Sequence, residues 1–256
     1  MPARGSVDRS PSSPPPTEEE DETEFDGDAS DSEEEDYEDD SGIQSDDPTR
    51  AKVEAVEEPP ADVTSLPAPV WSTPSATRFL QRELARCHTL VEHTTEEDRG
   101  WTMDFNAIQN VYQWQFQIRG FDKNLPLQKD LKAKRVTEGV VVEIRFGPDH
   151  PQTPPYVRII RPRFKQFCEG GGGHVTAGGS MCLEILTTNG WNPTLSIETV
   201  LLMTRVALSS LDPYPARLNH RWNVPYTGQE AMCAFVRVAM AHGWGVPRAW
   251  QSLFAA

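Results

Sequence analysis

Long apolar runs are missing from this chain of 256 residues. No stretch approaches the ~18 apolar residues of a membrane span, and the N-terminus carries no apolar segment of the kind found in secretory signals. The cysteines show no Cys-x-x-Cys spacing, so no usual zinc-ligand pattern is present. They are Cys87, Cys168, Cys182 and Cys233. We therefore expect free thiols, a cytoplasmic or nuclear location, no membrane contact, no bound metal and no cofactor.

Large apolar residues are also nearly absent from residues 1–62, apart from Phe25, Tyr37 and Ile43. This segment holds 23 of the 39 acidic residues and 4 of the 24 basic ones, a net charge of −19, which leaves +4 for residues 63–256. Such a composition buries too little apolar surface to offset the entropy of ordering. The sequence thus predicts a disordered acidic tail at 1–62, a Pro-rich linker at 63–74 and one folded domain at 75–256.

The spacing of apolar residues in that domain changes along the chain. A helical spacing after the Thr73-Pro74 start signal predicts a first helix with an inward stripe of Leu80, Leu84, Cys87 and Val91. Alternation predicts strands at 101–106, 112–118, 140–146 and 157–161, with Glu143 and Arg145 facing solvent in the third. The Lys-rich residues 122–138 are expected to be an insertion or a long hairpin loop.

Helical spacing returns in two later segments. Residues 196–211 follow the N-cap candidate Ser196, with Ile197, Val200, Leu201, Thr204, Leu208 and Leu211 inward. The last helix opens with the capping box Thr227-x-x-Glu230 and should stop at Gly243, with Met232, Phe235, Val236 and Ala239 inward. A helix, an antiparallel four-stranded meander and further helices together predict an α+β domain.

Cys182 lies in a segment whose residues match a known sequence pattern at most positions. The residues are Gly178-Gly179-Ser180-Met181-Cys182-Leu183-Glu184-Ile185-Leu186, followed by Trp191-Asn192-Pro193-Thr194-Leu195-Ser196-Ile197. This segment resembles the active-site signature of ubiquitin-conjugating enzymes, Gly-x-Ile/Val-Cys-Leu-x-Ile-Leu, a short spacer, and Trp-x-Pro-x-Leu-x-Ile. The resemblance covers residues 75–247. It implies the ubiquitin-conjugating fold and a Cys182 that carries the modifier as a thioester, which remains reactive toward amines and hydroxyls.

The glycines near Cys182 admit more than one interpretation. Residues 170–173 are all glycine, and Gly178-Gly179 follow shortly after. A nucleotide-binding loop is disfavoured because no Gly-Lys-Ser/Thr follows. We expect instead that the glycines leave room for a narrow C-terminal tail of the modifier beside the backbone.

Departures from the family pattern concern the residues around the thiol. Ordinary members carry His-Pro-Asn with the Asn eight residues before the Cys; here His174 holds that position, and it is a candidate oxyanion stabiliser, base or loop residue. An exposed loop His with no role is the alternative. Ordinary members also have an acid shortly after the Asp-Pro that ends the next helix, whereas Asp212-Pro213 is followed by Ala216 and Arg217.

These departures resemble the Q-type branch of the family. In that branch the terminal helix carries a His about one turn before its Gly-Trp. Here the match is loose, since His242 directly precedes Gly243-Trp244. A catalytic role for His242 and a capping role at the helix C-terminus both remain open.

The resemblance also implies partners. These are ubiquitin or a related modifier, an activating enzyme, a ligase and a protein substrate, with no specific nucleic acid. The ligase would bind the Trp-x-Pro turn and the loop before the fourth strand, at Trp191, Pro193, Thr194, Pro154 and Pro155. For Trp191, simple packing behind the active site is an equal alternative. Two other functions remain open: a catalytically silent module of the same fold that binds ubiquitin or a ligase, and a domain that merely anchors a functional acidic tail.

Overall fold

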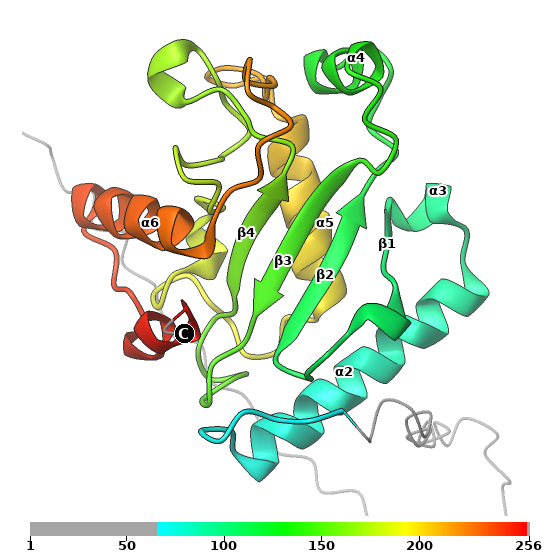
Figure 1. Cartoon of the computed structure of the whole chain (residues 1–256). Helices are drawn as coiled ribbons and strands as arrows, with labels where there is room; N and C mark the ends of the chain where they lie inside the picture. Colours follow the sequence, from blue (N-terminus) through cyan, green and yellow to red (C-terminus); the bar gives the residue numbers. More distant parts are fainter. Residues whose placement is uncertain (1–65, 255–256) are drawn as a thin grey trace, which may run out of the picture. The chain divides into compact units, whose positions relative to one another are not determined.

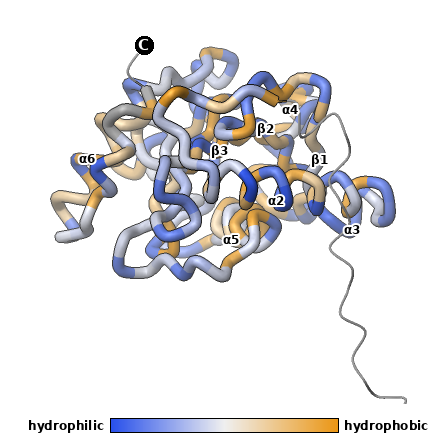
Figure 2. Tube along the Cα trace, turned by 90° about the horizontal axis from the view of Figure 1, so that it is seen from below, coloured by the Kyte–Doolittle hydropathy of each residue, from blue (hydrophilic) through white to orange (hydrophobic). Residues whose placement is uncertain are grey.

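The computed structural model describes residues 66–254. The predicted tail at 1–62 and the start of the linker lie outside these residues. The first described helix is α2, Pro74–His93, and the side chain of Thr73 caps it by accepting a hydrogen bond from Ala76 N. Leu80, Leu84 and Cys87 are buried along one face, as their spacing predicts. Figure 2 shows hydrophobic and hydrophilic residues alternating along this helix.

A four-stranded antiparallel sheet follows in the order β1-β2-β3-β4. Its strands are β1 Trp101–Thr102, β2 Gln113–Ile118, β3 Val140–Arg145 and β4 Tyr156–Arg161. In β2, the alternate residues Trp114, Phe116 and Ile118 are buried in the main core, as the two-residue period predicts. Figure 1 shows α5, Ile197–Ser209, crossing behind the sheet and α6, Gly228–His242, beside β4.

Glu143 in β3 is buried, so the prediction that it faces solvent is wrong. Its side chain is 1% exposed and accepts hydrogen bonds from Arg158 Nε at 2.5 Å and from Gln113 Nε2 at 2.6 Å. Arg158 also donates to Tyr226 O at 3.1 Å, so the segment before α6 covers this part of the sheet. A buried carboxylate is tolerated here because a cation and an amide satisfy its oxygens.

Two stretches differ from the strand and loop predicted for them. Only Trp101–Thr102 of the 101–106 stretch pairs as a strand, because Asp104 caps a short 3-10 turn, η1 Phe105–Ala107, by accepting from Asn106 N. The supposed loop at 122–138 contains α4, Pro126–Ala133, whose Leu127 and Leu131 are buried. Between α2 and β1, Glu96–Arg99 forms one further short helix, α3.

The last helices begin and end at the residues that carry their capping signals. Ser196 accepts from Thr199 N at the start of α5, and the Thr227–Glu230 capping box opens α6. Gly243 ends α6 with φ 68°. Leu211 lies beyond the end of α5 and is 59% exposed, so the inward position predicted for it is wrong.

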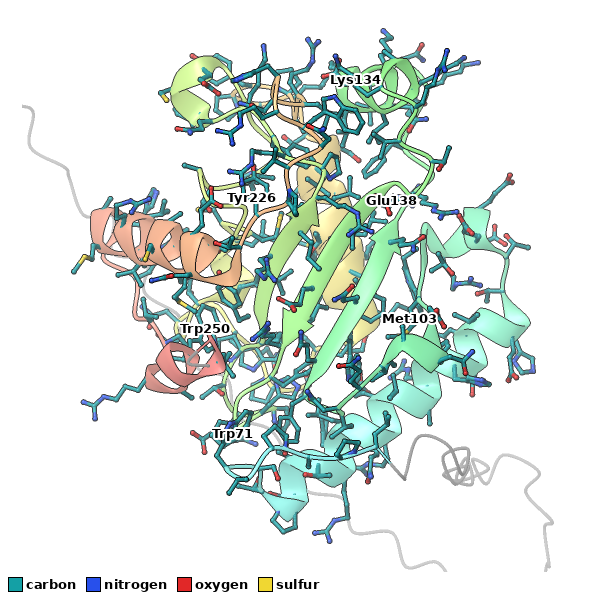
Figure 3. All side chains as sticks on the ribbon, in the orientation of Figure 1. Trp71, Met103, Lys134, Glu138, Tyr226 and Trp250 are labelled. Atoms are coloured by element: carbon teal, nitrogen blue, oxygen red, sulfur yellow. The ribbon has the colours of Figure 1, made fainter. Side chains whose placement is uncertain are left out.

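A second apolar cluster joins α6 to the C-terminal η4, Arg248–Phe254. Trp250 is buried there (Figure 3), and its indole N–H donates a hydrogen bond to Pro154 O. Phe235 and Ala239 of α6 are buried as predicted, whereas Met232 and Val236 are half-buried. No helix within residues 66–254 is long and apolar enough to cross a membrane.

Candidate active site

Residues 174–182 form a hairpin whose second strand lies against β4. Met181 N donates to Val157 O at 3.0 Å, and Ile159 N donates to Gly179 O at 2.7 Å. Within the hairpin Val175 pairs with Met181. The stretch before Cys182 is therefore attached to the edge strand β4 by an isolated bridge and two backbone hydrogen bonds, which fix the position of the thiol.

Cys182 itself is fixed through its backbone. Its N–H donates to His174 O at 2.8 Å, and its side chain is half-buried. Burial raises the pKa of the Cys182 thiol, and no neighbouring charge opposes that rise. At pH 7 the group is therefore mainly the neutral thiol rather than the nucleophilic thiolate.

The other cysteines have different surroundings. Cys87 is 2% exposed in the core, as its place on the helical stripe predicts, and burial raises the pKa of its thiol strongly. Cys168 and Cys233 are exposed, and all four thiols are free. Among the described residues, no group of three or more His, Cys, Asp and Glu side chains is placed to hold a metal ion.

His174 stands in the left-handed region of backbone conformation, with φ 56°. Its carbonyl accepts the N–H of Cys182, while its imidazole is exposed and makes no hydrogen bond to any residue of 66–254. A left-handed backbone is uncommon for residues other than glycine, and Asn and His are among those that tolerate it best. The position therefore has a backbone requirement that is independent of any chemistry of its side chain.

The hairpin is held against α6 by a buried hydroxyl. Ser180 is fully buried, donates to Ala231 O at 2.7 Å and also shares a hydrogen bond with the hydroxyl of Tyr156. The contact is close at the turn as well, because a Cβ on Gly178 would lie 2.2 Å from Glu230 O. The first turn of α6 is thus built against the strand that carries the thiol.

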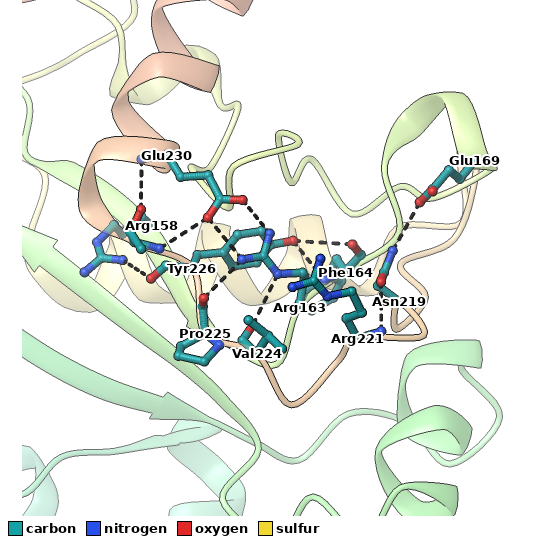
Figure 4. A network of polar contacts seen from close by, with 11 residues as sticks. Arg158, Arg163, Phe164, Glu169, Asn219, Arg221, Val224, Pro225, Tyr226 and Glu230 are labelled. Atoms are coloured by element: carbon teal, nitrogen blue, oxygen red, sulfur yellow. Dashed lines mark hydrogen bonds and ion pairs between the residues drawn. The ribbon is translucent and has the colours of Figure 1, made fainter.

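Glu230 links this helix end to the sheet (Figure 4). It accepts two hydrogen bonds from Arg163, at 2.5 and 3.0 Å, and caps Thr227 N. These bonds lower the pKa of the Glu230 carboxyl. The Arg163 guanidinium stacks over the Tyr226 ring at 4.1 Å, and that ring lies beside Gly179. The Arg163–Glu230 ion pair and the Arg163–Tyr226 stacking contact together support the hairpin from behind. Sequence patterns do not predict these contacts, because the residues lie far apart in the chain.

The glycines next to the hairpin do not form the open channel that we expected. A Cβ on Gly171, Gly172 or Gly173 would come within 2.8 Å of the chain itself. Gly172 is the tightest, at 1.6 Å from Tyr214 O, and its N–H donates to Pro215 O at 3.1 Å. A Cβ is excluded at Gly172 and Gly173 by the segment after α5, and at Gly171 by the backbone of Lys165.

That same segment contains Arg217, one of the residues found where ordinary members of the family carry an acid. The guanidinium donates to both carboxylate oxygens of Asp130, at 2.7 and 2.9 Å, and Leu218 N donates to Asp130 as well. Arg217 is the charge partner that lowers the pKa of the Asp130 carboxyl. The cation that follows Asp212-Pro213 is thus neutralised by a carboxylate of α4.

The predicted ligase-binding residues divide by exposure. Thr194 is exposed and Pro193 is half-buried. Trp191 is 9% exposed, and its indole N–H donates to Pro151 O at 2.7 Å. Pro154 and Pro155 are buried, with Trp250 bonded to the carbonyl of Pro154, so their side chains offer no surface to a partner. Any such surface is confined to the neighbourhood of Thr194 and Pro193.

His242 lies at the end of α6. Its imidazole stacks on the Trp244 ring, with centroids 4.7 Å apart, and within the described part of the chain it makes no bond to Cys182 or His174. The structure does not bring His242 and the thiol together. A basic residue in the last turn of a helix is favourably placed for the helix dipole, which fits the capping alternative.

Comparison with known proteins identifies the family. The family model described as ubiquitin-conjugating enzyme matches residues 79–231, more than half of the chain. The chain belongs to the ubiquitin-conjugating enzyme family. Its helix, four-stranded sheet and C-terminal helices are the fold that the signature implied.

Individual relatives point to one branch of that family. A Q-like ubiquitin-conjugating enzyme of Mus musculus is 26% identical over 142 residues, which are 54% of this chain and 84% of the relative. Ubiquitin-conjugating enzyme E2 25 of Caenorhabditis elegans is 29% identical over 146 residues, 56% of this chain and only 35% of the relative. A solved ubiquitin-conjugating enzyme from Plasmodium falciparum aligns with 22% identity and a TM-score of 0.39, over 57% of this chain and 91% of that chain. Relatives whose names place them in the Q group support the Q branch that the missing His-Pro-Asn triplet indicated.

Proposed function

We propose that Cys182 accepts ubiquitin as a thioester from a ubiquitin-activating enzyme and passes it, usually with a ligase, to a protein substrate. The observation that carries this proposal is the placement of Cys182: a half-buried thiol that directly follows a hairpin attached to β4, with its N–H bonded to His174 O. In charging, the Sγ attacks the thioester carbonyl on the activating enzyme, and the departing thiol takes up the proton that Cys182 loses. In transfer, the acceptor attacks the same carbonyl and Cys182 leaves as a thiol.

The acceptor includes hydroxyl groups in this proposal. A lysine side chain with its pKa near ~10.4 is almost wholly protonated at pH 7 and needs a group that removes its proton. Asp130 is the carboxylate next to Arg217, and its two oxygens are engaged by that guanidinium. A neutral hydroxyl needs a general base instead, and a His has a suitable pKa near ~6.5.

His174 is the candidate for that base. Its imidazole is exposed and unbonded within the described chain, and its backbone contacts Cys182 directly. The N–H of Cys182 already donates to His174 O, so it is not available to stabilise an oxyanion at the reacting carbonyl. Another hydrogen-bond donor has to do so. In this proposal the His174 imidazole can act either as the general base or as the hydrogen-bond donor to the oxyanion.

The ligase surface is proposed at the turn after Trp191. Thr194 is exposed there, and its hydroxyl donates to Asn192 Oδ1 at 2.9 Å. Free thiols throughout the described residues fit a reducing compartment, so we place the enzyme in the cytoplasm or nucleus.

The test is a charging assay with activating enzyme, ubiquitin and ATP, read on a non-reducing gel. We expect a thiol-sensitive adduct in the wild type and in Cys168→Ser and Cys233→Ser, which remove the two exposed thiols. Cys182→Ser should give a stable oxyester or no adduct. A folded Cys182→Ser protein that still forms the thiol-sensitive band disproves the assignment. A wild type that never charges leaves the silent binding module and the anchor for the acidic tail as the alternatives.

Discharge of the charged enzyme then separates the acceptors. The purified thioester is mixed with free lysine or free serine, and its loss is followed over time. Loss with serine at least as fast as with lysine supports the hydroxyl proposal. Rapid loss with lysine and none with serine contradicts it.

A further inference from the structure

The α4 helix is fastened to the segment that packs beside the thiol hairpin. Figure 1 shows α4 at the same end of the sheet as the chain that follows α5. The fastening is the pair of bonds from Arg217 to Asp130, together with the bond from Leu218 N to the same carboxylate. Leu127 and Leu131 anchor the other side of α4 in the core.

A short series of contacts connects this helix to Cys182. Gly173 lies against Ala216, the residue before Arg217, since a Cβ there would be 2.7 Å from the Ala216 side chain. His174 follows Gly173 and holds the N–H of Cys182. The segment bound to α4 thus packs against the residue that precedes His174, the backbone partner of Cys182.

The surface of α4 and its flanks carries an excess of positive charge. Its exposed cations are Lys123, Lys129, Lys132, Lys134 and Arg135, which we call the α4 basic surface. None of these five forms an ion pair with a residue of 66–254, and Figure 3 shows Lys134 at the α4 end of the sheet. Asp122 is the exposed acid of the same stretch, because Asp130 is bound to Arg217 and Glu138 to Arg161.

We infer that the α4 basic surface binds an acidic segment of the protein substrate and so guides the acceptor residue to Cys182. The inference rests on the proposed function, in which Cys182 transfers its cargo to a substrate. Clustered cations without an ion-pair partner in the described structure attract an acidic segment, raise its local concentration and speed its association.

A polypeptide fits this surface better than a nucleic acid. Residues 122–138 contain no Phe, Tyr or Trp on which bases could stack. The helix has 8 residues and is therefore about 12 Å long, a length matched by a few residues of extended acidic chain.

Binding is measured with the full-length, uncharged protein and two fluorescent peptides of equal length. One peptide carries a serine and a lysine between runs of glutamate, and the other replaces each glutamate by glutamine. We expect the glutamate peptide to bind more tightly in anisotropy titrations at low salt. Lys129→Glu/Lys132→Glu should weaken it about tenfold, an effect that fades as salt screens the charges.

The matched control is Arg237→Glu/Arg248→Glu, which makes the same change in net charge. Both of these arginines are exposed and make no ion pair in the described structure. The control should bind the glutamate peptide as the wild type does. Equal weakening in the two double variants, or equal binding of the two peptides, overturns the inference.

Transfer kinetics provide the second readout. With the charged enzyme, Lys129→Glu/Lys132→Glu should raise the KM for the glutamate peptide about tenfold, with kcat and the charging rate unchanged. If neither the wild type nor any variant charges, the proposed function is wrong. The anisotropy titrations use uncharged protein, so they still test whether the α4 basic surface binds the glutamate peptide. If a single-stranded oligonucleotide displaces the bound glutamate peptide at far lower concentration than the unlabelled peptide does, the surface is a nucleic-acid site and the inference is wrong.

Discussion

His174 permits an experiment that separates the backbone from the side chain. Its φ of 56° places a non-glycine residue in the left-handed region, at a cost of roughly 1–2 kcal/mol for an ordinary L-residue. Replacement by Gly removes that cost but adds roughly 0.5–1 kcal/mol of conformational entropy to the unfolded chain. We therefore expect His174→Gly to change the free energy of unfolding by less than about 1 kcal/mol.

Alanine and asparagine complete the series. His174→Ala keeps the strain and loses the residue type that tolerates it, so it should be less stable than the wild type by about 0.5–1 kcal/mol. His174→Asn should be nearly neutral, since Asn is also enriched in this conformation. Arg135, which follows α4 and has φ 57°, is the matched control for strain in the stability measurements. The stability difference between Arg135→Ala and Arg135→Gly calibrates the backbone effect in this protein.

Rates then decide whether the imidazole has a chemical role. A general base contributes ~10²–10⁴ to a rate, so loss of the ring should slow discharge onto serine by at least about a hundredfold in all three His174 variants. Charging should slow less, because thiol exchange does not need that base. If His174→Gly and His174→Asn discharge as fast as the wild type, the ring has no catalytic part and the position serves the backbone alone. If His174→Gly unfolds more easily than His174→Ala, the strain argument fails.

Three further predictions concern the thiol, the ligase surface and the hairpin turn. Because burial raises the pKa of Cys182, the thiolate fraction and hence the charging rate should rise about tenfold per pH unit between about pH 6 and about pH 8; a plateau below about pH 7 would show a stabilised thiolate. Thr194→Asp should weaken ligase-dependent transfer and leave charging intact, and an equal loss in both assays would contradict the ligase assignment. Gly179→Ala adds a Cβ 2.6 Å from the Tyr226 ring at φ 94°, so urea denaturation should show a loss of about 2–4 kcal/mol. At Gly170 the φ is a similar 76°, but an added Cβ would meet nothing within 4 Å. Gly170→Ala should therefore lose only the stability that backbone strain costs, and equal losses of stability in the two variants would rule out the steric contact at Gly179.

Local signals in the sequence were sufficient for the helices that carry capping residues. Thr73, Ser196 and Thr227 each accept a hydrogen bond from a backbone N–H in the first turn that follows. Cys87 was predictable as a core residue because its helical spacing reports burial directly. The signature around Cys182 likewise gave the family, since its residues are contiguous in the chain.

Long-range contacts between charged residues were not predictable in the same way. Glu143 alternates with apolar residues and so was predicted to face solvent, but its partner Arg158 lies on the next strand and both are buried. Asp130 and Arg217 are 87 residues apart, and no local pattern relates them. The helix α4 did have a signal, Pro126 followed by Leu127 and Leu131, which the abundance of lysine obscured.

The environment of Cys182 has a consequence for chemical labelling and for oxidative stress. Alkylating reagents and peroxide attack thiolates, so a thiol that burial keeps protonated reacts slowly with both. Cys168 and Cys233 are more exposed and should be modified first. Mass-spectrometric mapping with iodoacetamide should therefore label Cys168 and Cys233 before Cys182, the proposed thioester residue. The same protection would allow the enzyme to remain competent for charging in a cell whose exposed thiols are already oxidised.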